Sequence, residues 1–140
     1  MATTETMLGN AKAVATEFFH EMTEWEKWCA EFDVNRSSEE THELRLTRLE
    51  AIFNNYLTAK ALKHKQSRYE FLDFEMPPEF SHGISSVEPA EGGKVWVYKP
   101  TGMMNGRARF LMESEDGTWK VAFREDDVAN TGKWRKALDL

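Results

Sequence analysis

Apolar and polar side chains alternate between residues 94 and 124, as antiparallel strands require. Asp116-Gly117 predicts a two-residue type I′ turn, because both central residues of that turn need positive φ. A turn at this point sets a register that pairs Arg109 with Arg124. Residues 94–99 supply the preceding strand, whose apolar interior predicts a central place in the sheet. Because successive side chains point to opposite faces, the register predicts one core face: Ala108, Phe110, Met112, Trp119, Val121 and Phe123.

Residues 10–33 have the apolar period of a helix. The stripe recurs every three or four positions and consists of Val14, Phe18, Met22, Trp25, Cys29 and Phe32. Acidic residues fall on the opposite side, namely Glu17, Glu21, Glu24 and Glu31. At 100° per residue, Trp28 projects into the middle of that acidic stripe. A second helix is predicted from about Ser37 to about His64, with Tyr56 at the centre of its apolar face.

Length and composition fit one domain that spans residues 1–140. The chain is 41% hydrophobic, which allows an adequate core. No apolar run approaches the roughly 20 residues of a membrane span, and no N-terminal segment has the pattern of a secretory signal. Cys29 is the only cysteine, so no intramolecular disulfide can form. We therefore expect a cytoplasmic location and no membrane partner.

The formal net charge of −6 lies entirely in residues 1–42, which hold nine acidic and three basic side chains. The remaining residues balance, so the charge pattern disfavours nucleic-acid binding. A basic protein would be drawn to the N-terminal end, with Trp28 as an aromatic anchor and Glu21 and Glu24 as its charged rim. The alternative is a solvated helix face, with Trp28 covered by a loop or by the chain terminus.

Catalytic and metal motifs are absent from the sequence. The four histidines match no metal-ligand spacing, and Cys29 on a buried stripe is a poor nucleophile. We expect no metal, no cofactor and no identifiable catalytic residue. Helices packed on a bent sheet can still leave a cavity, with His82, Glu113 or Asp73 as a lone general base. Four aromatic residues are its predicted lining: Tyr56, Trp96 (or Tyr98 in its place), Phe110 and Trp119.

The predicted pairing of Arg109 with Arg124 is a second candidate for binding. Like charges directly opposed on one face of a sheet are unfavourable unless a third group neutralises them. That group is either an acid on the next strand or a bound anion or acidic partner surface. By contrast, Glu113 is predicted to face Lys120 and to form a cross-strand ion pair.

Helices followed by a strongly aromatic antiparallel meander resemble the nuclear transport factor 2-like fold. The resemblance implies an α+β class in which N-terminal helices pack in the concave face of a curved antiparallel sheet, giving a cone. Short motifs between about residues 65 and 138 are similar to bacterial immunity proteins of that fold. These motifs are Pro77-Pro78-Glu79-Phe80, Ile84-Ser-Ser-Val87-Glu88, Val95-Trp-Val-Tyr98, Ala108-Arg-Phe110, Gly117-Thr-Trp119-Lys-Val121 and Gly132-Lys-Trp134.

The resemblance implies a small protein-binding domain that neutralises a cognate toxin by binding it, as immunity proteins of polymorphic toxin systems are thought to do. A cofactor-free isomerase, dehydratase or cyclase is the alternative, because the same fold hosts such enzymes. An enzyme needs an inward-facing acid or histidine near an oxyanion donor, whereas a binding protein can fill its cone with aromatic side chains. A domain that forms a homodimer and has no separate activity is a third hypothesis.

Overall fold

The computed structural model describes residues 3–33, 38–63, 83–101 and 106–136. Three helices come first: α1 (Thr4–Asp33), α2 (Ser38–Tyr56) and α3 (Ala59–Lys63). The strands follow as β1 (Ser86–Ala90), β2 (Lys94–Pro100), β3 (Arg107–Glu115), β4 (Thr118–Asp127) and β5 (Arg135–Lys136), with a 3₁₀ turn at Glu91–Gly93. They form one antiparallel sheet in that order.

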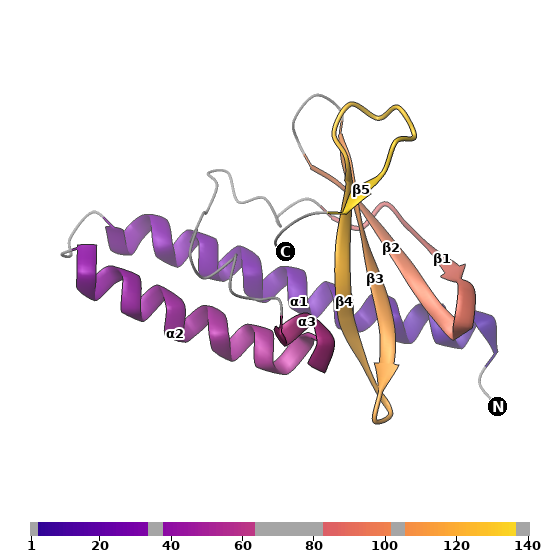
Figure 1. The fold of residues 1–140 in the computed structure, drawn as a ribbon, viewed down its shortest axis with the longest axis horizontal. Coiled ribbons are helices and arrows are strands. Elements are labelled where there is room, and N and C mark those ends of the chain that lie inside the picture. Colours follow the sequence, from indigo (N-terminus) through magenta and orange to yellow (C-terminus); the bar gives the residue numbers. More distant parts are fainter. Residues whose placement is uncertain (1–2, 34–37, 64–82, 102–105, 137–140) are drawn as a thin grey trace.

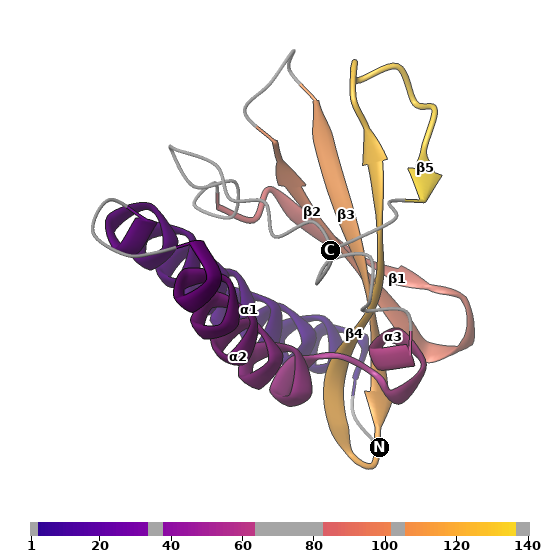
Figure 2. The same cartoon turned by 60° about the vertical axis from the view of Figure 1, so that its left-hand side comes forward.

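Helices α1 and α2 lie on the same side of the curved sheet in both views (Figure 1 and Figure 2). This arrangement confirms the predicted α+β class with N-terminal helices packed against a curved antiparallel sheet. We call the face toward the helices the inner face and the opposite one the outer face. Strand β2 lies between β1 and β3, which confirms its predicted interior position.

Helix α1 buries most of the stripe that its period predicts. Phe18, Met22, Trp25 and Cys29 are at most 1% exposed, while the side chain of Phe32 lies outside the described residues. Trp25 donates a hydrogen bond from Nε1 to the carbonyl of Arg45 in α2, at 3.1 Å. This bond satisfies the indole N–H in the core and ties the two helices together.

The second predicted helix is interrupted, so its prediction as one helix reaching about His64 is wrong. Helix α2 ends at Tyr56, and the next two residues pair with the sheet: Leu57 bridges Val121, and the Thr58 N–H donates to the Val121 carbonyl at 3.0 Å. The Thr58 hydroxyl then accepts the N–H of Ala61 at 3.1 Å, which caps the start of α3. The pairing of Leu57 and Thr58 with β4 therefore replaces a continuation of helix α2.

The Asp116-Gly117 turn has the predicted geometry, with φ of 53° and 80°. It sets the predicted register as far as Met112 opposite Val121. Beyond that pair a β-bulge makes Ala122 an extra residue on β4, so Leu111 pairs with Phe123. A bulge of one residue reverses the side-chain alternation that follows it.

The bulge corrects two predictions from the sequence. Arg109 lies opposite Glu125, and Arg124 lies opposite Phe110, so the predicted pairing of the two arginines is wrong. Phe123 is also misplaced in the prediction, because it lies on the outer face, where its ring contacts that of Trp96. The rest of the predicted core face stands: Ala108, Phe110, Met112 and Val121 are fully buried, and Trp119 packs against them.

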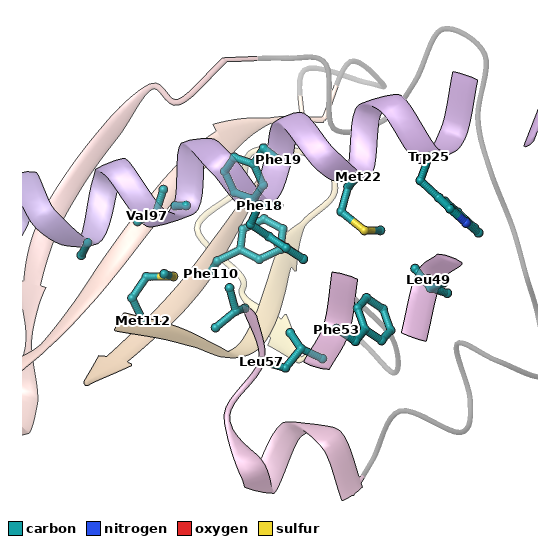
Figure 3. Packing of buried hydrophobic residues seen from close by; sticks show 14 of the residues in the cluster. Phe18, Phe19, Met22, Trp25, Leu49, Phe53, Leu57, Val97, Phe110 and Met112 are labelled. Atoms are coloured by element: carbon teal, nitrogen blue, oxygen red, sulfur yellow. The ribbon is translucent and has the colours of Figure 1, made fainter. Parts of the chain in front are cut away.

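Aromatic side chains from α1 fill the space between the helices and the sheet (Figure 3). The ring centroids of Phe19 and Phe110 lie 4.8 Å apart, and those of Phe18 and Phe110 lie 6.5 Å apart, both edge to face. Leu49, Phe53 and Leu57 complete the core from the side of α2. These contacts hold α1 and α2 on the inner face, while α3 begins beside the hairpin end of the sheet, where the Ala59 N–H donates to Glu115 at 3.1 Å.

Candidate functional site

The outer face carries a ladder of stacked aromatic and arginine side chains, which we call the outer ladder: Trp96, Tyr98, Arg109, Phe123 and Trp134. The Arg109 guanidinium lies between two indoles, with its carbon 4.1 Å from the Trp96 ring centroid and 4.4 Å from that of Trp134. Each contact is within the range of a cation–π interaction. Strands β2, β3 and β4 and the residue before β5 all contribute to the ladder.

Hydrogen bonds fix Arg109 in this position. Its Nε donates to Oε1 of Glu125 at 2.7 Å, and Nη1 donates to the Tyr98 hydroxyl at 3.4 Å. Burial lowers the pKa of the Arg109 guanidinium, but the bonds to Tyr98 and Glu125 outweigh burial and raise it overall. Glu125, which lies opposite Arg109 on β4, is thus the acid that neutralises it. Because Arg109 and Arg124 do not face each other, neither neutralising group that the sequence suggested for such a pair is needed.

Tyr98 connects the ladder to β1. Its hydroxyl donates to Oε1 of Glu88, which lies on the neighbouring strand. Burial and this hydrogen bond raise the pKa of the Tyr98 phenol above its ordinary value. The phenol therefore stays neutral near pH 7 and acts as a donor that orients the carboxylate.

Asp127 anchors the turn that brings Trp134 onto the outer face. Its carboxylate accepts N–H bonds from Thr131 at 2.9 Å and Gly132 at 2.8 Å, and pairs with Arg107 at 3.1 Å. Burial raises the pKa of Asp127, but these bonds more than offset it and lower the pKa overall. The Arg107 guanidinium also stacks on Trp134 at 4.7 Å, so one carboxylate positions both side chains.

The residues predicted on the helices are all engaged within the helix pair. Trp28 is half-buried, and the Arg48 guanidinium of α2 lies 4.3 Å from its ring centroid. Glu21 is hydrogen-bonded to Tyr56; burial first, and then the charges of Glu21 and Glu17, raise the pKa of this phenol. In the described part of the chain, Arg48 of α2 therefore lies over Trp28, so a helix contributes to the cover that the sequence assigned to a loop or the chain terminus.

Glu24 remains on the exposed side of α1. Its carboxylate lies 3.7 Å from Lys27, and both side chains are more than half exposed. Such a pair contributes little to stability. It also reduces the acidic character that the sequence predicts for this part of α1.

Three of the four predicted cavity residues lie toward the inner side. Phe110 is fully buried, Trp119 packs against the core, and Tyr56 contacts Phe18 at 5.6 Å between ring centroids. The placement of Trp96 in a cavity is wrong. Val95 and Val97 occupy the inner positions of β2, so the alternation of the strand turns Trp96 outward.

The bulge brings charged side chains to the inner face. Arg124 is 8% exposed, and its Nε donates to Oδ1 of Asp126 at 2.8 Å. Lys99 of β2 is also buried and donates to the Pro100 carbonyl at 3.0 Å. Arg124 therefore lies on the opposite face from Arg109, and the predicted binding site formed by the two arginines is wrong.

The residues nominated for catalysis do not form a reactive centre in the described part of the chain. His82 and Asp73 lie outside it. Glu113 faces Lys120 in the register but pairs with Lys94 at 3.0 Å, while Lys120 donates to the Asn55 carbonyl; the predicted Glu113–Lys120 ion pair is wrong. Burial raises the pKa of the Cys29 thiol to about 12, which leaves almost no thiolate near pH 7.

Reasoning from the sequence missed Trp134, Tyr98 and Glu125 as members of one surface. The four-residue spacing of Trp134 and Leu138 is typical of a helical turn, whereas residues 135–136 form β5, and Leu138 lies outside the described residues. One local signal was available. Asn130-Thr-Gly132 is a turn sequence, with φ of 56° and 84° at its ends, and a turn after a strand favours a returning strand.

Comparison with known proteins identifies one family. The family model described as "NTF2 fold immunity protein" matches residues 10–138. No curated protein and no solved structure gives a significant match. Among the described residues, no helix is both long enough and apolar enough to cross a membrane.

Proposed function

The chain belongs to the family of NTF2 fold immunity proteins, and on that premise we propose that it binds a cognate toxin and neutralises it in the bacterial cytoplasm. The match over residues 10–138 carries the proposal. It covers the helices, the sheet and Trp134 together. Neutralisation of this kind needs no chemistry of its own, because occupying the toxin's functional surface is sufficient.

The packing of the inner face supports binding over catalysis. Phe18, Phe110 and Met112 have 0% exposed surface there, and an enzyme of this shape needs that space for a substrate. The buried charges on this face are engaged: Arg124 is bonded to Asp126, and Lys99 to the backbone. Neither arrangement supplies the free acid or base that an isomerase or a dehydratase requires.

Two surfaces hold the residues proposed to contact the toxin. One is the helix pair, with Glu21, Glu24 and Trp28, which would suit a basic toxin. The other is the outer face around Arg109. Arg124 does not belong to this surface, because it is buried on the inner face.

Co-expression tests the proposed function directly. The protein encoded immediately upstream of this gene is expressed in a host cell with and without the chain, and growth is recorded. We expect growth arrest by the upstream product alone, rescue by the chain, and a complex of the two that co-purifies. Arrest that the chain does not relieve, without a complex, would contradict the proposal.

A further inference from the structure

We propose that the toxin docks on the β5 end of the outer face, with Trp134 and Arg109 at the centre of the contact. The complementary toxin surface is a protein surface on which carboxylates flank an apolar side chain. This inference rests on the proposed function and names the surface that performs it. Three observations support it: the composition of the outer ladder, its rigidity and the local charge.

The outer ladder has the composition of an interface hot spot. Trp, Tyr and Arg are the residue types enriched at such centres, and the ladder contains all three. Trp96, Tyr98, Phe123 and Trp134 are each half-buried, so every ring keeps surface that a partner can cover. Helices α1 and α2 do not lie over these rings, because they occupy the other side of the sheet (Figure 2).

The ladder is also rigid before any partner binds. Arg109 is held by Glu125, by Tyr98 and by two indoles, and its side chain is 20% exposed. Ordering a free arginine at an interface costs about 0.5–1.5 kcal/mol. Because contacts within the fold already order Arg109, binding a partner does not incur this cost. By contrast, the indole of Trp28 lies under Arg48 in the seam of the helix pair.

The charge at this end of the sheet is opposite to that of the N-terminal third. Four cations and three carboxylates belong to the outer face and the turn before β5: Arg107, Arg109, Lys133 and Lys136, against Glu88, Glu125 and Asp127. Arg135 adds an exposed cation on β5. Lys133, Arg135 and Lys136 are exposed and form no ion pair with a described residue. The Arg107 side chain is 39% exposed and its partner Asp127 is 1% exposed, so solvent meets the cation.

The positive charge at this end of the outer face favours an acidic protein partner over a basic one or a second copy of the chain. A basic surface would be repelled here and drawn to residues 1–42, where the net charge is −6. A second copy in a symmetric contact would bring two cationic ends together, which is unfavourable. An acidic surface matches the exposed cations Lys133, Arg135 and Lys136, and its apolar side chain can cover the ring of Trp134. The Phe123 ring is already contacted by the Lys136 ammonium, 4.7 Å from its centroid.

The test is the affinity of the purified chain for the upstream-encoded protein, measured by calorimetry. Trp134→Ala should weaken binding by roughly thirtyfold or more, as expected for loss of an aromatic hot spot. Because β5 is short, this variant could also disturb the fold. The double variant Lys133→Glu with Arg135→Glu changes only exposed side chains outside the outer ladder, and it should weaken the affinity on the order of tenfold at low salt, because association slows.

The matched control is Lys60→Glu with Lys63→Glu on α3. It makes the same change in net charge at exposed positions near the other end of β4, where the Ala59 N–H contacts Glu115, and it should leave affinity within about twofold. Wild-type binding that neither test variant weakens would overturn the docking site and leave the proposed function standing. The docking site would also be overturned if only one of the two test variants weakened binding. It would be overturned as well if the variants only dissociated a dimer of the chain. Failure of the wild type to bind would remove both proposals.

Discussion

The two faces of the sheet consist of side chains from the same strands, but different interactions stabilise them. On the inner face, Phe110 and Met112 are covered completely by helix side chains, so apolar burial dominates. On the outer face, stacked rings alternate with guanidinium groups and ion pairs, and every ring stays partly exposed. A face that is ordered but not covered is the one able to accept a partner without reorganising the fold.

A single extra residue creates much of this difference. Without Ala122 as a bulge, Phe123 would point inward and Arg124 outward, as the turn register predicts. The bulge places Phe123 beside Trp96 on the outer face and lets Glu125 meet Arg109. The outer ladder therefore depends on an irregularity in β4, and bulges often re-aim side chains at functional places.

The largest expected effect separates the two phenylalanines that the bulge divides. Phe110→Ala removes a fully buried ring and should destabilise the fold by about 3–5 kcal/mol. Phe123→Ala removes a half-buried ring on the outer face and should cost about 1 kcal/mol. Urea unfolding of both variants measures this difference. Equal costs would mean that both rings face the core, and the bulge would then be wrong.

A smaller effect tests how the outer ladder is held together. Arg109→Lys keeps the charge but loses the planar group that stacks between Trp96 and Trp134. We expect a loss of about 1 kcal/mol in the free energy of unfolding. Arg135→Lys is the control, since Arg135 is exposed and outside the ladder, and it should be neutral. An Arg109→Lys variant as stable as the wild type would show that the stack contributes no stability.

The smallest effect concerns the turn that carries Trp134. The pKa of Asp127 is lowered from its ordinary 3.8 in the folded chain, so its contribution to stability is complete above pH 4. That contribution falls as pH decreases through the lower, folded pKa. Asp127→Asn should therefore have a lower melting temperature at pH 7, and the gap to wild type should narrow below pH 4. A gap that is constant with pH would contradict the role of the ionised carboxylate.

Local patterns predicted most of the fold, and long-range packing set the rest. The Asp116-Gly117 turn and the period of α1 are local signals with one structural solution each. The bulge at Ala122 has no such signal, because its sequence contains neither glycine nor proline. The cover over Trp28 was also hidden, since Arg48 reaches it from a different helix. Trp134 and Trp96 both stack on Arg109 although β3 and β4 separate β2 from β5 in the sheet, and no spacing in the sequence encodes that arrangement.

The most direct test compares two tryptophans, one on each candidate surface. The affinity of the upstream-encoded protein is measured for Trp134→Ala and Trp28→Ala side by side, with circular dichroism to confirm that both variants are folded. Docking on the outer face predicts a loss of roughly thirtyfold or more for Trp134→Ala and a change within about twofold for Trp28→Ala. A large loss for Trp28→Ala with unchanged affinity for Trp134→Ala would contradict the account and place the toxin on the helix pair.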